Sequence, residues 1–127
     1  MKTPSRKILV IDDEEMLRRN LAAMLEDEGF EVTAVENGED AIQAVRDGRY
    51  AAAIVDMRLP GIDGNEVILQ AHALAPDMRF VIYTGSTDYV VPDALAAIGL
   101  DESMVHHKPA DGDTLVAALR RASGSGH

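Results

Sequence analysis

The hydrophobic residues of this chain gather in short runs, and each run ends on a polar or charged residue. Continuous apolar runs of about four to six residues are typical of strands buried on both faces of a parallel sheet. In such sheets functional groups gather just beyond the carboxyl ends of the strands, so we expect the polar residues that follow the runs to meet at one edge. The runs are residues 7–11, followed by Asp12, Asp13 and Glu14; 51–55, followed by Asp56; 80–83, followed by Thr84; and a weaker run, 104–107, followed by Lys108 and Pro109.

The stretches between these runs show the three-to-four-residue hydrophobic spacing of amphipathic helices. Residues 30–35 instead alternate between polar and apolar positions, which indicates a further strand near an edge of the sheet. The first predicted helix covers residues 14–28, with Leu17, Leu21, Met24 and Leu25 on one face and Gly29 as its stop signal. Further helices are predicted at residues 39–47, 65–74 and 92–98, the last stopped by Gly99, and a final helix, capped by Asp111 or Asp113, runs to about residue 122.

Strands and helices therefore alternate along the chain in five βα units. With right-handed crossovers this predicts a doubly wound, three-layer α/β domain with a five-stranded parallel sheet. Two strand orders fit the pattern, the flavodoxin-like order 2-1-3-4-5 and a half-Rossmann order. In the first, the switch point between strands one and three brings Asp12, Asp13 and Asp56 across one crevice. We expect one domain over residues 1–122 and a disordered tail of linker composition at 123–127.

Composition restricts the classes of function. With 127 residues the chain has the size of one domain. Its 22 acidic and 12 basic residues give a net charge of −10, which argues against direct binding to nucleic acid or to an anionic membrane. The chain has no cysteine, so disulfides, zinc–thiolate sites and thiol catalysis are excluded. Because the sequence has neither an 18-residue apolar stretch nor a signal-peptide pattern, we expect a cytoplasmic protein.

The residues at the predicted sheet edge favour phosphoryl chemistry beside a divalent cation. The carboxylates repel one another, because two unit charges ~4 Å apart at an effective dielectric constant near ~20 cost about 4 kcal/mol. A cation relieves this repulsion, and Mg²⁺ suits all-oxygen ligands and uses one or two carboxylates. Lys108 adds a second positive charge, which keeps a neighbouring carboxylate ionised and able to attack phosphorus. Thr84 and Lys108 are then placed to contact phosphoryl oxygens.

Each of these residues also has a simpler explanation when it is considered alone. The acidic run 12–14 could cap the first helix, where carboxylates favour the positive end of the helix dipole. Asp56 and Thr84 could be turn residues, and Lys108 could be a solvated surface residue. Their joint placement at successive strand ends favours a common site over these separate explanations.

Together these motifs resemble the receiver domain of two-component response regulators over about residues 6–121. The resemblance rests on residues 8–14 (ILVIDDE), 55–64 (VDMRLPGIDG), 83–85 (YTG) and 108–109 (KP). It implies the CheY-like, flavodoxin-like three-layer fold with strand order 2-1-3-4-5. It also implies a regulatory domain that is not an enzyme, although it assists its own phosphorylation and dephosphorylation.

The same resemblance implies the roles of the acidic residues. Asp56 would accept a phosphoryl group from the phosphohistidine of a histidine kinase, or from a small phosphodonor. Asp13 and Asp56 would ligate Mg²⁺, with Asp12 acting mostly through water. The backbone carbonyl of Arg58 would be a further ligand of the ion.

The resemblance also assigns the remaining site residues and the partners. Thr84 and Lys108 would hold the phosphoryl group, and the Lys108–Pro109 bond is expected to be cis. The implied partners are a sensor histidine kinase or phosphotransfer protein and an unidentified downstream protein, without direct contact to nucleic acid or a membrane. Two alternatives remain. One is an aspartyl-phosphate phosphatase of the haloacid-dehalogenase type, which normally has a second acid where this chain has Arg58, and the other is a degenerate receiver that acts without phosphorylation.

The chain departs from the family pattern at three positions that bear on signalling. Receivers usually carry an aromatic residue three positions before the lysine, whereas this chain has Val105. Gly85 replaces a common alanine, and Ala110 replaces a common aromatic residue. We therefore expect phosphorylation to reorder the loop 85–91 more than it changes the fifth strand.

Four further residues are weaker candidates for a role in the site. His106 and His107 are neighbours in a predicted strand, so their side chains point to opposite faces and do not share a metal ion. We expect one of them to be partly buried and hydrogen-bonded and the other to face solvent. Tyr83 is expected in the hydrophobic core, and Tyr89 is a candidate for an exposed output loop.

Overall fold

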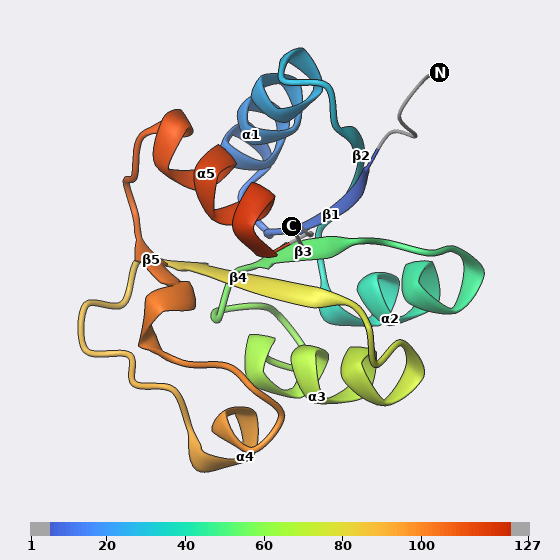
Figure 1. Ribbon diagram of the computed structural model, residues 1–127, viewed down its shortest axis with the longest axis vertical. Helices are drawn as coiled ribbons and strands as arrows, with labels where there is room; N and C mark the ends of the chain where they lie inside the picture. The colour runs from blue at the N-terminus through green and yellow to red at the C-terminus, as the bar shows by residue number, and fades with distance from the viewer. Residues whose placement is uncertain (1–5, 123–127) are drawn as a thin grey trace.

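The structure is a computed structural model that describes residues 6–122, and it contains a five-stranded parallel sheet with helices on both faces (Figure 1). The strand order is β2-β1-β3-β4-β5, which confirms the flavodoxin-like order and excludes the half-Rossmann one. The strands are β1 (Lys7–Ile11), β2 (Glu31–Val35), β3 (Ala52–Val55), β4 (Arg79–Thr84) and β5 (Val105–His107). The helices are α1 (Glu15–Asp27), α2 (Gly38–Asp47), α3 (Gly64–Leu74), α4 (Asp93–Ala96) and α5 (Gly112–Ala122), and a 3₁₀ turn, η1 (Glu102–Met104), precedes β5.

Different helices cover the two faces of the sheet, which gives the three predicted layers. α1 and α5 lie on one face, and α2, α3 and α4 lie on the other (Figure 1). Successive residues of a strand point to opposite faces, so Ile8 and Val10 pack with α1 and α5 while Leu9 and Ile11 pack with α2 and α3. The central strand β3 is buried along its whole length, and its sequence is apolar throughout for this reason.

Most predicted elements lie within one or two residues of their observed bounds. β2 is an edge strand, as its sequence indicated, but its exposure does not alternate: Glu31 and Ala34 are exposed and the other three residues are half-buried. Gly29 has a φ of 97°, a left-handed conformation that ends α1 at the predicted stop signal. Of the two candidate caps for the last helix, Asp111 is the one used, because its Oδ1 atom accepts the Thr114 N–H at 2.9 Å.

The segment between β4 and β5 departs from the prediction. The helix predicted at residues 92–98 is only one turn, Asp93–Ala96, and Gly99 with a φ of 106° follows it. Met104, predicted to begin the last strand, lies in the 3₁₀ turn, where its N–H donates to the Asp101 carbonyl at 3.0 Å. The Asp101 carboxylate accepts a further backbone N–H, so local side-chain bonding competes with strand extension. β5 therefore has only three residues.

Within residues 6–122 no helix combines the length and the hydrophobicity needed to cross a membrane. The predicted tail at residues 123–127 lies outside the described part of the chain. The domain boundary at residue 122 stays a prediction for the same reason.

Candidate functional site

The parallel sheet brings the polar residues that end the apolar runs to one edge. β1 pairs with β3 in register, so the residues after their ends, Asp12 and Asp56, are neighbours. The Asp56 N–H donates to the Ile11 carbonyl at 3.0 Å, which extends this pairing past the last strand residue. β4 and β5 lie next in the sheet and deliver Thr84 and Lys108 to the same edge.

Three carboxylates meet at this edge. Asp12, Asp13 and Asp56 each offer an oxygen atom, and these atoms lie within 4.8 Å of one another. Asp12 is 3% exposed and Asp56 is 5% exposed, whereas Asp13 faces solvent. An all-oxygen donor set that is open to water on one side fits Mg²⁺, which keeps several water ligands. It does not suit zinc, because the cluster contains neither cysteine nor histidine.

Lys108 lies against the two buried carboxylates. Its Nζ atom is 2.9 Å from Oδ2 of Asp12 and 3.3 Å from Oδ2 of Asp56. The side chain of Lys108 is 18% exposed, so these ion pairs are only partly screened by water. The structure therefore brings the predicted lysine and two of the predicted aspartates into direct contact, while the contact of Lys108 with a phosphoryl group stays a prediction.

Burial and neighbouring charges shift the pKa values of Asp56 and Lys108. Burial raises the pKa of the Asp56 carboxyl, and this effect outweighs the opposing influence of the Arg58 N–H and the Lys108 charge. Burial alone would lower the pKa of Lys108, but the hydrogen bond and charge of Asp12, together with Asp56, outweigh it and raise that pKa. Lys108 is therefore charged at neutral pH, and Asp56 sits where water solvates its charge poorly. Perturbed carboxyl groups of this kind are typical of functional sites.

Backbone N–H groups fix the orientation of both buried carboxylates. Oδ1 of Asp56 accepts the Arg58 N–H at 3.1 Å, and Oδ1 of Asp12 accepts the Glu14 N–H at 2.9 Å. The other oxygen of each carboxylate faces Lys108. Glu14, the residue at the cap position of α1, makes no side-chain cap bond. A simple helix cap therefore explains neither the burial of Asp12 nor its contact with Lys108.

Thr84 connects the cluster to the loop that follows β4. Its side chain is fully buried, and its Oγ1 atom accepts the Ser86 N–H at 3.1 Å. The Thr84 carbonyl accepts the Lys108 N–H at 2.8 Å, so the ends of β4 and β5 are joined beside the carboxylates. A change in the position of the Thr84 hydroxyl would therefore break or alter its hydrogen bond with the Ser86 N–H.

Tyr83 supports the lysine, a role that the sequence did not reveal. Its ring is buried in the hydrophobic core, as expected. Its hydroxyl accepts the Ala110 N–H at 3.1 Å, and Nζ of Lys108 lies 5.6 Å from the ring centre. The bond between Lys108 and Pro109 is cis, as the resemblance implied. No sequence spacing signals these contacts, because they depend on the path of the loop after β5.

The two histidines of β5 are outside the acidic cluster. His106 is half-buried and His107 is exposed, which agrees with opposite orientations. The prediction that the partly buried ring is hydrogen-bonded is wrong for one of its nitrogen atoms. Nε2 of His106 is buried and has no hydrogen-bond partner among the described residues. Burial and the charge of Arg121 lower the pKa of His106, so its ring is neutral at neutral pH.

Known proteins match this chain along nearly its whole length. Residues 8–120 match the family model of the response regulator receiver domain. The chain is 30% identical over 115 residues to the uncharacterized transcriptional regulatory protein YkoG of Bacillus subtilis. This match covers 91% of this chain and 50% of YkoG. It is 32% identical over 120 residues to the transcriptional regulatory protein FixJ of Azorhizobium caulinodans, and this match covers 94% of this chain and 56% of FixJ. The chain thus spans about half the length of these curated relatives.

A solved structure of similar length has the same fold. The response regulator protein TrrA of Thermotoga maritima was solved in complex with Mg²⁺-BeF. It matches with a TM-score of 0.80 and 29% identity, over 92% of this chain and 98% of that chain.

Proposed function

The chain belongs to the response regulator receiver domain family, and we propose that it is the phosphoacceptor switch of a two-component phosphorelay, with Asp56 as the acceptor. The observation that carries the proposal is the contact of Asp56 with Lys108 inside a cluster of three carboxylates. The similarity to TrrA, solved with Mg²⁺-BeF, supports the same chemistry. Intact-mass measurement after incubation with acetyl phosphate and Mg²⁺ tests the proposal, with one added phosphoryl group as the expected result.

The proposed transfer step uses the groups gathered at the sheet edge. An oxygen of the Asp56 carboxylate attacks phosphorus, and a new P–O bond forms. The bond between phosphorus and the histidine nitrogen of the donor breaks, and its electron pair leaves with the imidazole. Lys108 exchanges its contact with Asp56 for a phosphoryl oxygen, and the Thr84 hydroxyl donates to another. Water later attacks phosphorus, which releases phosphate and restores the carboxylate.

The residues of the acidic cluster would also hold Mg²⁺. Asp13 and Asp56 would be direct ligands, Asp12 would act mostly through water, and the backbone carbonyl of Arg58 would add a further oxygen. When bound, the ion neutralises charge on the phosphoryl group during transfer. Asp13 faces solvent and forms no ion pair among the described residues, so its carboxylate is accessible to an ion from water.

Replacing Asp13 with asparagine should weaken Mg²⁺ binding by at least about tenfold, because it removes one of two charged direct ligands. Isothermal titration calorimetry of the protein with MgCl₂ measures the effect. Glu14→Gln is the matched control, since it removes the neighbouring exposed carboxylate, which lies outside the cluster. Equal affinities of wild type and Asp13→Asn would contradict the proposed ligand.

The proposed partners follow from this chemistry. Upstream, a sensor histidine kinase or a phosphotransfer protein supplies the phosphoryl group, and downstream a protein that is not yet identified reads it. The curated relatives are named transcriptional regulators, and this chain covers about half of their length. The proposal therefore concerns residues 8–120 alone, where the acidic balance of charge disfavours direct contact with nucleic acid.

The alternative functions have less support. Arg58 occupies the position where phosphatases of the haloacid-dehalogenase type normally carry their second acid. A receiver that acts without phosphorylation would not need Asp56, Thr84 and Lys108 together at one edge. The proposal of a phosphoacceptor accounts for all of these residues.

The loop 85–91 is fastened at three points, and these points show how a signal could leave the site. Tyr89, half-buried, is the central anchor, and burial with the charges of Glu102 and Asp63 raises the pKa of Tyr89 to about 12. Its hydroxyl therefore stays protonated at neutral pH and can donate a hydrogen bond. The three bonds run from Ser86 N–H to Thr84 Oγ1 (3.1 Å), from Tyr89 hydroxyl to Asn65 Oδ1 (2.7 Å) and from Val91 N–H to Glu102 Oε2 (2.8 Å).

A beryllofluoride mimic of phosphate should loosen this loop more than it changes β5. The Thr84 hydroxyl turns toward the mimic and gives up its bond to Ser86, whereas Val105 offers no large ring that must move. Hydrogen–deuterium exchange should become faster across residues 85–91 and stay nearly unchanged across 105–107. Tyr89→Phe removes one anchor and should show part of the faster exchange without the mimic. Changes confined to residues 105–107 would show that the loop is not the output element.

A further inference from the structure

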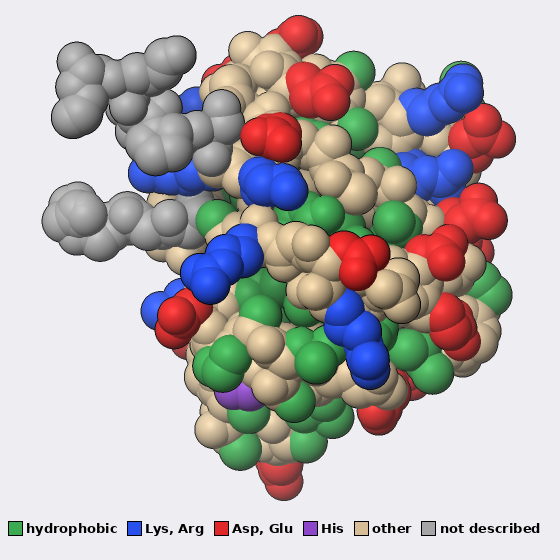
Figure 2. All heavy atoms as spheres, turned by 90° about the vertical axis from the view of Figure 1, so that its right-hand side faces the viewer, with side chains coloured by type: hydrophobic (Ala, Val, Ile, Leu, Met, Phe, Trp, Pro, Cys, Tyr) green, Lys and Arg blue, Asp and Glu red, His purple; other side chains and the backbone are tan. Residues whose placement is uncertain are grey.

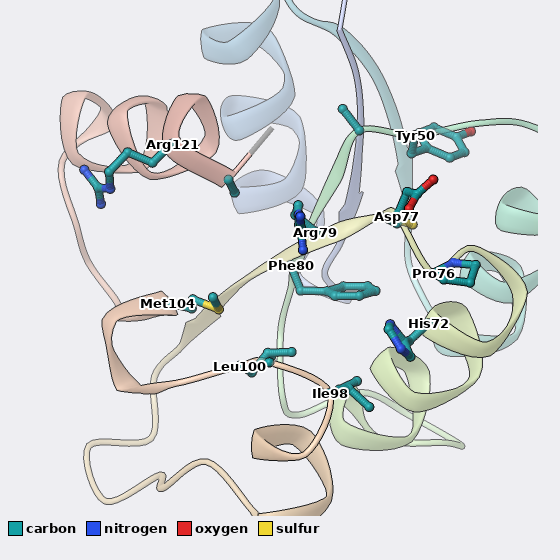
Figure 3. Close-up of a pocket in the computed structure, with 14 residues that line it drawn as sticks. Tyr50, His72, Pro76, Asp77, Arg79, Phe80, Ile98, Leu100, Met104 and Arg121 are labelled. Carbon is teal, nitrogen blue, oxygen red and sulfur yellow. The ribbon is translucent and has the colours of Figure 1, made fainter. Parts of the chain in front are cut away.

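A hollow lies at the edge of the sheet opposite the acidic cluster, where the strands begin (Figure 3). Its volume is about 680 Å³, and Phe80, Leu100 and Met104 contribute apolar surface to it. A second hollow of about 430 Å³ adjoins it, and the two share Tyr50 and residues 76–78. We call the two hollows together the arginine groove, after the side chains around them.

The short α4 explains why the larger hollow exists. The other four helices have 10 to 13 residues, whereas α4 has 4. At 1.5 Å per residue α4 is only about 6 Å long, while the strand beneath it spans about 20 Å. α4 therefore covers only part of β4, and the connection through Ile98 and Leu100 borders the hollow beside Phe80 (Figure 3).

Arginine side chains line both hollows. Arg79 and Arg121 line the larger one, and Arg46 and Arg49 line the smaller one. Among residues 6–122, none of these four guanidinium groups forms an ion pair. In the same part of the chain, Asp77 is the only acidic residue that lines either hollow. A chain with 22 acidic and 12 basic residues thus has a local excess of positive charge here.

Apolar side chains line the hollows between these cations, and one of them, Leu74, is well exposed. Figure 2 looks onto the side of the molecule where the strands begin, and basic, acidic and hydrophobic side chains are interspersed across it. Leu74 lines the smaller hollow and is 44% exposed. A single exposed leucine is ordinary, but this one lies beside unpaired arginines and an open hollow. The surface thus combines apolar contact area with positive charge.

We propose that the arginine groove binds an acidic, amphipathic peptide segment of a partner protein. Carboxylates of the segment pair with the arginines, whose planar guanidinium groups suit bidentate contacts. Apolar side chains between those carboxylates fill the hollows near Phe80 and Leu74. A small organic anion would occupy one hollow and leave the arginines of the other unpaired. The proposal is independent of Asp56, because the groove lies at the opposite edge of the sheet.

A fluorescein-labelled synthetic peptide of glutamate and leucine residues is a suitable probe. Fluorescence anisotropy at low ionic strength should show saturable binding that weakens as salt is added. A peptide with lysine in place of glutamate should not bind at the groove, because its charges have the same sign as the arginines. In ¹⁵N NMR spectra the glutamate peptide should shift the amide signals of Gly48 and Gly99, which line the groove, and leave Gly85 beside the acidic site unchanged.

The double variant Arg46→Glu, Arg79→Glu should bind this peptide at least about tenfold more weakly. Both side chains are exposed, so the fold should persist, and an unchanged far-UV circular dichroism spectrum and melting temperature would verify it. Arg19→Glu is the matched control, because it makes the same charge change at a 73% exposed side chain on α1. Undiminished binding by the double variant would overturn the proposal. So would self-association through the groove, or octanoate binding there as tightly as the peptide, since each would identify a different occupant.

Discussion

Replacing Asp56 with asparagine should abolish phosphorylation by acetyl phosphate in the presence of Mg²⁺. Asparagine keeps the shape of the side chain but lacks the ionised oxygen that attacks phosphorus. The neighbouring carboxylates do not substitute for it: Asp12 stays paired with Lys108 at 2.9 Å, and Asp13 faces solvent. Intact-mass measurement should therefore show full labelling of the wild type and none of the variant.

Asp63→Asn is the matched control for this experiment, since it makes the same chemical change seven residues later in the same loop. Asp63 caps α3, where its Oδ1 atom accepts the Glu66 N–H at 3.0 Å, and asparagine caps a helix equally well. This variant should be labelled like the wild type. Full labelling of Asp56→Asn would show that another residue is the acceptor.

The raised pKa of Asp56 adds a pH dependence with a defined sign. Phosphorylation needs the carboxylate, so its initial rate should fall as the pH drops and the carboxyl group takes up a proton. Folding stability runs the other way. A carboxyl group with a raised pKa contributes stability that is fully present below its unfolded pKa and is lost as the pH rises through its folded pKa. As the pH is lowered across the acid range, the phosphorylation rate should therefore fall, while the contribution of Asp56 to folding stability should increase.

The sheet and the position of its functional edge could be predicted from the sequence, for a simple physical reason. A central parallel strand is buried on both faces, so it is apolar at every position, as in β3. The first polar residue that follows such a strand in the sequence must then lie at the edge of the sheet. Asp56 and Thr84 were found in this way, because each directly follows or ends an apolar run.

The contacts that complete the site were not predictable in the same way. The contact between Lys108 and Asp12 joins residues that are 96 positions apart in the sequence, and it depends on the path of the loop after β5. The bond between Tyr83 and the Ala110 N–H depends on the same path. The short α4 was missed because Pro92 and Gly99 bound a segment with helical spacing, and nothing in that spacing fixes how many turns pack on the sheet. Local patterns define elements, whereas these features depend on tertiary packing.

Replacing Lys108 with methionine should destabilise the fold by about 2 kcal/mol in Mg²⁺-free buffer, because it breaks a largely buried ion-pair network. Asp12 and Asp56 are only 3% and 5% exposed, and among the described residues Lys108 is their only ion-pair partner. Without it, two poorly solvated carboxylates face each other. Added Mg²⁺ supplies the missing charge, so it should raise the unfolding midpoint of the variant more than that of the wild type.

Lys7→Met is the matched control, because Lys7 lies 5.0 Å from the ring centre of Tyr50 and has no ion pair among the described residues. It should change stability little, with or without Mg²⁺. The raised pKa of Lys108 means that its contribution is present at neutral pH and is lost as the pH rises through that value. The difference between wild type and Lys108→Met should therefore shrink in strongly alkaline solution. Equal midpoints at neutral pH, or equal responses to Mg²⁺, would show that Lys108 does not balance these carboxylates before the phosphoryl group arrives.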